Sequence, residues 1–125
     1  MGATYFVVDE IEFPDELASP TAPRELVEDA QRSGARRKYL ARGEGGFFSQ
    51  VSWFPAGYEV PLHRHDHDEL IMVVEGSLTM LGEDVTLGPL DSMVLTGGHE
   101  YGFTAGPDGM TITTIRTAPS AATLG

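Results

Sequence analysis

The chain has 125 residues, which fits a single domain, and its 8 Lys and Arg against 19 Asp and Glu give a formal net charge of -11. A field this negative repels phosphate backbones and anionic lipid surfaces, so we expect neither nucleic acid nor a membrane as a partner. The sequence contains no cysteine, which excludes disulfides, thiolate metal ligands and cysteine nucleophiles. Any metal must therefore be bound through nitrogen and oxygen atoms.

The first 35 residues carry two different patterns. Residues 4–13, TYFVVDEIEF, are rich in β-branched and aromatic side chains and predict a strand that ends at Pro14. They show neither the basic segment nor the apolar run of a signal peptide, so we expect a cytoplasmic protein. Residues 21–33, TAPRELVEDAQRS, have a proline near the first turn, acids early and a base late, before Gly34. This order predicts a short helix, and its few apolar residues favour a place on the surface.

The remainder of the chain consists of short apolar segments separated by Gly, Pro and Asp. Breaks such as GEGG, FPAG, GED and GPDG supply residues that tolerate turn backbones. Many short strands without intervening helices indicate an antiparallel sandwich or barrel. The predicted strands are residues 36–42, 47–54, 58–64, 69–75, 77–81, 85–87, 91–95, 99–104 and 110–117.

The stretch HRHDHDEL, residues 63–70, contains three of the four histidines. Alternate side chains of a strand point the same way, so His63 and His65 share a face and can lean toward one ion. Glu69 has the same parity, and a turn before it would bring its carboxylate to that ion from the next strand. Two imidazoles and a carboxylate favour Fe(II), Mn, Ni, Zn or Cu over Mg or Ca. His99 is available as a fourth ligand.

Other interpretations of these polar residues remain open at this point. His63 and His65 can be hydrogen-bonded strand residues without a metal, and Glu69 can be an ion-pair partner or a catalytic base. His99 can be a histidine of the pocket rim. We interpret His67 as a solvated turn residue, because a site using His65 and His67 leaves too few residues to turn the chain before Glu69.

Two motifs resemble those of the cupin superfamily. GYEVPLHRHDHDELIMVVEG, residues 57–76, has the glycines, histidines and glutamate of the first cupin motif at the required spacing. LGPLDSMVLTGGHEYGF, residues 87–103, is similar to the second motif, with His99 as its ligand. It departs from that motif because Thr96 replaces a usual proline and the turn before His99 is about two residues shorter.

The resemblance implies an all-β fold, a cupin-type double-stranded β-helix or jelly-roll barrel, here with an N-terminal strand and a short helix. It divides the chain into residues 1–35, which pack on the barrel, residues 36–117, which form it, and a flexible tail at 118–125. It also implies one divalent transition metal and a homodimer, as is common for single-barrel cupins. The implied ligands are His63, His65, Glu69 and His99.

The expected function follows from an ion with positions open to substrate. Apolar and aromatic residues near the site favour a small enolisable or aromatic substrate. By resemblance the first expectation is an Fe(II)-type dioxygenase, with Glu69 and Tyr101 as catalytic residues. The Tyr101 hydroxyl can exchange a proton with substrate, or can simply be buried and hydrogen-bonded. A non-redox isomerase, cyclase or lyase and a non-catalytic ligand sensor are the alternatives.

The segment LIMVVEG, residues 70–76, is apolar on both faces. A barrel strand whose outer face meets water should instead alternate with polar residues. Either the predicted strand at 4–13 or a second subunit therefore covers this outer face.

Overall fold

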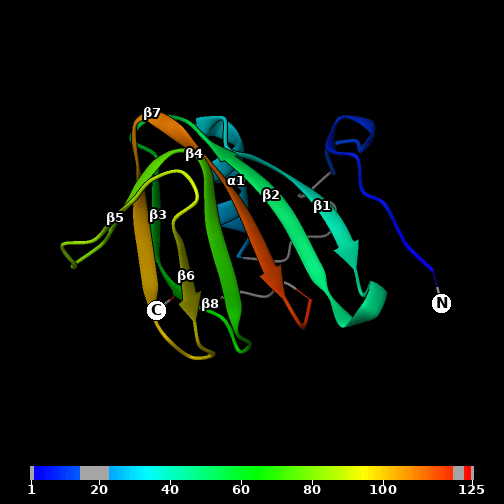
Figure 1. Ribbon diagram of the computed structural model, residues 1–125. Helices are drawn as coiled ribbons and strands as arrows, with labels where there is room; N and C mark the ends of the chain where they lie inside the picture. Colours follow the sequence, from blue (N-terminus) through cyan, green and yellow to red (C-terminus); the bar gives the residue numbers. More distant parts are fainter. Residues whose placement is uncertain (1, 15–22, 120–122, 125) are drawn as a thin grey trace.

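Eight strands dominate the described part of the chain, residues 2–14, 23–119 and 123–124 of a computed structural model (Figure 1). Helix α1 (Arg24–Ser33) and two short 3-10 helices, η1 (Val8–Glu10) and η2 (Glu44–Gly46), accompany them. All described strand pairs are antiparallel, which confirms the predicted all-β class. The strands are β1 (Arg36–Arg42), β2 (Phe48–Phe54), β3 (Glu59–Arg64), β4 (Glu69–Met80), β5 (Thr86–Leu87), β6 (Ser92–Leu95), β7 (Tyr101–Arg116) and β8 (Thr123–Leu124).

The long strand β7 organises the sheet because different strands flank its two halves. Residues 110–116 pair with β2 on one side and with the first half of β4 on the other. Residues 101–104 pair with β3, and residues 103–105 pair with the end of β4. The sheet therefore curves around a common core, in which Val73 and Leu78 of β4 are fully buried.

Two predicted breaks are irregularities within long strands. The predicted strands 69–75 and 77–81 merge into the single strand β4, which ends at Met80, and residues 101–104 and 110–116 of the last two predicted strands belong to β7. The β4–β7 register shifts near Gly76, which adopts a φ of 73°. A Cβ atom there would overlap the carbonyl of Gly109, so the two backbones pack closely and glycine is required. The glycines therefore permit bulges within paired strands instead of ending them.

The predicted strand at 4–13 is wrong. Within residues 2–14 the chain forms the 3-10 turn η1 and otherwise has no regular structure. The segment lies beside β1 (Figure 1), where the Lys38 Nζ donates a hydrogen bond of 2.9 Å to the Val8 carbonyl. The Phe13 ring contacts Trp53 edge-on. β-branched and aromatic side chains favour a strand only where a neighbouring strand pairs with them, and here none does.

Two residues of the C-terminal segment are paired with the sheet. Thr123 and Leu124 form β8, which pairs with the end of β3 opposite Arg64 and His63. Residues 120–122 and 125 of the predicted tail lie outside the described residues. The division of the chain at residues 35 and 117 stays a prediction.

Helix α1 is confirmed, although its position differs from the prediction. It ends at Gly34, whose φ of 91° gives the left-handed cap that glycine favours. Residues 21 and 22 of the predicted helix lie outside the described residues. Val27 is buried and Ala30 packs against the core, so the helix covers part of the interior. Among the described residues, no helix has the length and apolar character needed to cross a bilayer.

Candidate metal centre

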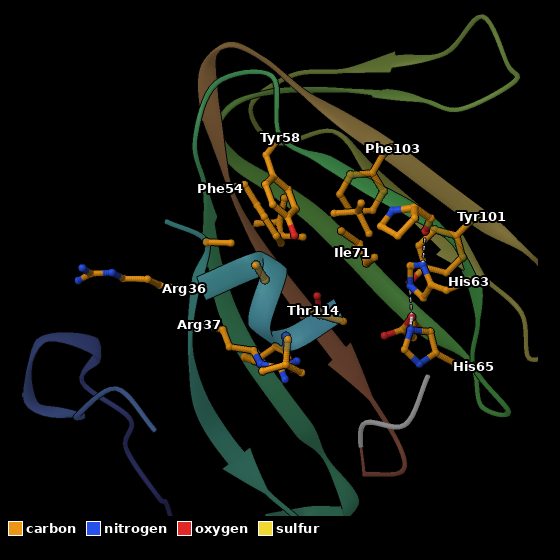
Figure 2. A pocket seen from close by; sticks show the side chains of 18 of the residues that line it. Arg36, Arg37, Phe54, Tyr58, His63, His65, Ile71, Tyr101, Phe103 and Thr114 are labelled. Carbon is orange, nitrogen blue, oxygen red and sulfur yellow. Dashed lines mark hydrogen bonds and ion pairs between the residues drawn. The ribbon is translucent and has the colours of Figure 1, made fainter. Parts of the chain in front are cut away.

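A cavity of about 150 Å³ lies inside the curved sheet, beside helix α1 (Figure 2). Its lining is divided into an apolar part and a polar part. The apolar part includes Val27, Phe54, Tyr58, Ile71, Phe103 and Ile112. The polar part includes Gln50, His63, His65, Glu69, Tyr101, Thr114 and Arg116.

His63 and His65 are both buried at this polar part, as their shared parity predicts. Their rings lie 5.0 Å apart, and His63 is opposite Tyr101 in the β3–β7 pairing. The Nδ1 of His63 lies 2.8 Å from the Pro61 carbonyl oxygen, which can only accept a hydrogen bond. Nδ1 is therefore the donor in this hydrogen bond, and the tautomer with its proton on Nδ1 has an Nε2 lone pair for a metal.

Glu69 is a buried carboxylate with partners on both oxygens. The Tyr101 hydroxyl donates to Oε1 at 2.7 Å, and His65 Nε2 lies 3.2 Å from the same oxygen. Arg116 Nε donates to Oε2 at 2.9 Å, and Arg116 Nη1 donates to the Gln50 side-chain oxygen, also at 2.9 Å. The guanidinium compensates the negative charge of the buried carboxylate.

Arg116 is a site residue that sequence reasoning missed. It is 5 % exposed although it is charged. Ile112, Thr114 and Arg116 alternate along β7, and all three line the cavity. Its phase with the inward-facing positions of the last long strand was the one signal that could have identified it.

Tyr101 lines the polar part of the cavity. Its hydroxyl is satisfied by a carboxylate and not by backbone. Burial, followed by the negative charge of Glu69 and its hydrogen bond, raises the pKa of the Tyr101 hydroxyl well above its ordinary value. The group is therefore a hydrogen-bond donor at neutral pH.

The structure does not bring His99 to the site. The side chain is exposed and does not line the cavity. Strand β7 begins at Tyr101, and His99 lies in the preceding turn, where its backbone nitrogen donates to the Thr96 carbonyl. The shortened turn thus places Tyr101 opposite His63. A ligand role for His99 stays a prediction without support from this geometry.

His67 differs from the solvated turn residue that the sequence predicts. Both its ring nitrogens are buried, and neither has a hydrogen-bond partner among the described residues. One potential ligand atom from each of His65, His67 and Glu69 lies within 4.8 Å of the others. Arg64 and Asp66 are exposed, in agreement with the expectation that they point away from the site.

These donors fit a transition metal. Buried imidazole nitrogens and a carboxylate suit Fe(II), Mn, Ni, Zn or Cu, and the nitrogens of His67 have no hydrogen-bond partner among the described residues that would compete with an ion. The residues that would hold such an ion come mainly from the loop between β3 and β4 and from its two flanking strands.

Among the comparisons with known proteins, the solved structures identify the fold. No protein-family profile and no curated protein matches the sequence. A structure of KdgF from Halomonas sp. is 23 % identical with a TM-score of 0.67, and the match covers 94 % of this chain and 96 % of that one. An RmlC-like cupin from Shewanella frigidimarina is 22 % identical with a TM-score of 0.67, with 93 % of each chain covered. The polyketide cyclase RemF from Streptomyces resistomycificus is 18 % identical with a TM-score of 0.64, covering 93 % of this chain and 78 % of that one.

The chain therefore has the cupin fold, a small jelly-roll barrel of antiparallel strands. This confirms the fold that the two sequence motifs indicated.

Proposed function

We propose that this protein is a metal-dependent cupin enzyme that binds one divalent transition metal through His63, His65 and Glu69. The observation that carries the proposal is a buried cluster of imidazoles and a carboxylate beside an otherwise apolar cavity. The His63 tautomer fixed by the Pro61 carbonyl supports it, because metal-binding histidines commonly donate their other nitrogen in this way.

The cavity favours a small organic substrate with a flat apolar body. Its volume of about 150 Å³ is similar to that of an engineered apolar cavity that binds benzene, about 150 Å³. Phe54 and Tyr58 stack with ring centroids 5.2 Å apart, and Phe103 meets Phe54 edge-on. These rings would contact the apolar body of an aromatic or enolisable molecule and exclude water from it, while its oxygen atoms face the polar residues.

Each polar residue has a distinct task in the proposed reaction. A bound metal ion would supply Lewis-acid polarisation of a substrate oxygen or, if it is iron, access to dioxygen chemistry. Tyr101 would hold Glu69 through its hydroxyl hydrogen bond, and its hydroxyl oxygen could accept a hydrogen bond from a substrate hydroxyl. Arg116 would fix the direction of the Glu69 carboxylate through its hydrogen bond to Oε2.

An Fe(II)-type dioxygenase is our first candidate, because imidazole and carboxylate ligands with open positions suit iron and oxygen. Non-redox catalysis by an isomerase, cyclase or lyase is the second candidate. The similarity to a structure named as a polyketide cyclase favours this alternative. A ligand sensor without turnover is the third, since a cavity of this kind can bind without reacting.

Metal analysis of protein purified without added metal tests the proposal. We expect about one metal ion per chain in the wild type and none in His63→Ala or His65→Ala. Arg64→Gln is the matched control, because this exposed side chain lies between the two histidines. The proposal is wrong if both histidine variants keep the same metal as the wild type.

Substrate screening then separates the candidates. Oxygen consumption with diketones or catechols supports the dioxygenase. Exchange of an enolisable substrate proton for deuterium without oxygen supports non-redox catalysis. Substrate binding with neither effect supports the sensor.

We also propose that a second copy of the chain covers the outer face of β4. Leu70 pairs with Val94 of β6 and with Ile115 of β7, and these three side chains form an outward-facing row. Val94 is 68 % exposed and Ile115 is 36 % exposed. Residues 2–14 lie beside β1 instead, so the alternative that an N-terminal strand covers this face is wrong (Figure 1).

Light scattering after size-exclusion chromatography tests this partner. The wild type should be a dimer and Val94→Glu a monomer. Val85→Glu, a change at another exposed valine on the β4–β5 hairpin, should remain a dimer. A monomeric wild type would contradict the proposal.

A further inference from the structure

His67 has buried polar atoms that the fold itself leaves unsatisfied. Both ring nitrogens lack hydrogen-bond partners among the described residues, whereas the Nδ1 of His63 lies 2.8 Å from the Pro61 carbonyl oxygen and the Nε2 of His65 lies 3.2 Å from Glu69 Oε1. A buried imidazole without a partner costs free energy, and native proteins rarely leave one without a compensating ligand, water or ion. No described residue supplies that partner, so the position of His67 fits a bound ligand or ion.

The neighbours of His67 identify the kind of partner. A ligand atom of His67 lies within 4.8 Å of ligand atoms of both His65 and Glu69. Atoms bound to one transition metal at about 2.1 Å lie at most about 4.2 Å apart. The three side chains therefore need only small shifts to share one ion. An ion bound there would accept the lone pair of a His67 nitrogen and would lie against the Glu69 carboxylate.

The backbone holds His67 in this place. The Gly98 nitrogen donates to the His65 carbonyl at 2.7 Å, and the Gly97 nitrogen donates to Asp68 Oδ1 at 2.8 Å. A Cβ atom on Gly97 would approach the Asp66 carbonyl oxygen at 3.1 Å, so the two loops are in close contact. The His65–Asp68 loop is thus fixed on both sides of His67, whose ring centroid lies 5.1 Å from that of His65.

We infer that His67, and not His99, completes the metal site. This inference rests on the proposed metal binding and changes its ligand set. The protein ligands would then be four alternate residues of a single segment, His63, His65, His67 and Glu69. His99, from the second motif, is exposed, and Tyr101 occupies the cavity position opposite His63. The site would lie entirely within the β3–β4 connection and its two flanking strands.

Cobalt binding to the intact protein tests this assignment. Co(II) affinity and its visible absorption spectrum should be measured for the wild type, His67→Gln, His99→Gln and the control Arg64→Gln. We expect His67→Gln to weaken Co(II) binding by about 100-fold or more, because even partners of metal ligands contribute about 10–100-fold. Its absorption bands should also shift. His99→Gln and Arg64→Gln should keep the wild-type affinity and spectrum.

A second measurement uses the wild-type chain and does not depend on the folding of a variant. Histidine ring signals in nitrogen–proton NMR spectra, with the His99 signal identified from His99→Gln, should be recorded before and after addition of Zn(II). The His67 ring should shift strongly and the His99 ring should not. The inference is overturned if His99 shifts and His67 does not, or if His67→Gln binds Co(II) as the wild type does. A wild type that binds neither metal would overturn the proposed metal function together with it.

Discussion

Two loops face each other at the polar part of the cavity. The sequence predicts the side-chain placement correctly in one of them and not in the other. The loop between β3 and β4 carries His65 and leads to Glu69, both buried at the site. The turn between β6 and β7 carries His99, which is exposed. The first loop is short and follows a paired strand, so alternation of side chains still holds near its ends. In the second, a difference of two residues moves a side chain from the cavity to solvent and places Tyr101 there instead.

In the first loop, we expect the largest loss of stability from replacing Arg116, the cation that pairs with Glu69. Arg116→Met leaves the Glu69 carboxylate buried without its guanidinium, so we expect the free energy of unfolding to fall by about 4 kcal/mol. Urea unfolding of metal-free protein measures the change. The double variant Glu69→Gln/Arg116→Met should be more stable than the sum of the single changes implies, because neither charge is then left unpaired. Simple additivity would show that the ion pair does not hold this loop.

The glycines that delimit the first motif provide a matched pair. Gly57 and Gly76 both have positive φ, but only at Gly76 would a Cβ atom overlap another backbone group, the Gly109 carbonyl. Gly57→Ala should cost about 1–2 kcal/mol for its backbone conformation alone. Gly76→Ala should cost about 3 kcal/mol, because overpacking adds to that conformational cost. Equal losses in urea unfolding would mean that β4 and β7 separate easily at the bulge.

Sequence reasoning located the site where strand periodicity applies. His63, His65 and Glu69 lie together because their parity and their adjoining strands leave little freedom, and the confirmed cupin fold agrees with their spacing. Helix α1 was predictable from its end signals, although its packing on the cavity was not. Val27 and Ala30 are too few to define an apolar face, so only the three-dimensional structure shows what they cover.

The missed features depend on long-range contacts. Arg116 is acceptable inside the barrel only because Glu69, 47 residues earlier, lies opposite it. His67 turns inward because the loop around it bonds to Gly97 and Gly98, about 30 residues further along. The segment at 4–13 has the composition of a strand, but no strand edge pairs with it. Local patterns contain none of this information.

A third prediction concerns the buried hydrogen bond between Tyr101 and Glu69, the residues that directly follow the two loops. Tyr101→Phe removes the hydroxyl that donates to Glu69 Oε1, and a hydrogen bond to a charged group is worth about 2 kcal/mol. Urea unfolding of the metal-free variant should show a loss of about that size. Tyr58→Phe is the control, since Tyr58 lines the same cavity and its hydroxyl makes no hydrogen bond among the described residues. A loss at Tyr58 as large as at Tyr101 would assign the effect to ring packing.

We expect the smallest effect from the exposed hydrogen bond between Gly97 and Asp68, which joins the same two loops. Asp68 Oδ1 accepts a hydrogen bond of 2.8 Å from the Gly97 nitrogen at the protein surface, where water competes for both groups. Asp68→Ala should therefore cost only about 0.5–1 kcal/mol of global stability. Hydrogen exchange at the Gly97 amide should nevertheless become faster, because local opening of the turn no longer breaks this bond. Asp68→Asn keeps an acceptor oxygen and should retain most of the protection. If exchange at Gly97 were unchanged in Asp68→Ala, the bond to the His65 carbonyl from Gly98 would be enough to hold the loops together, and Asp68 would not help to orient His67.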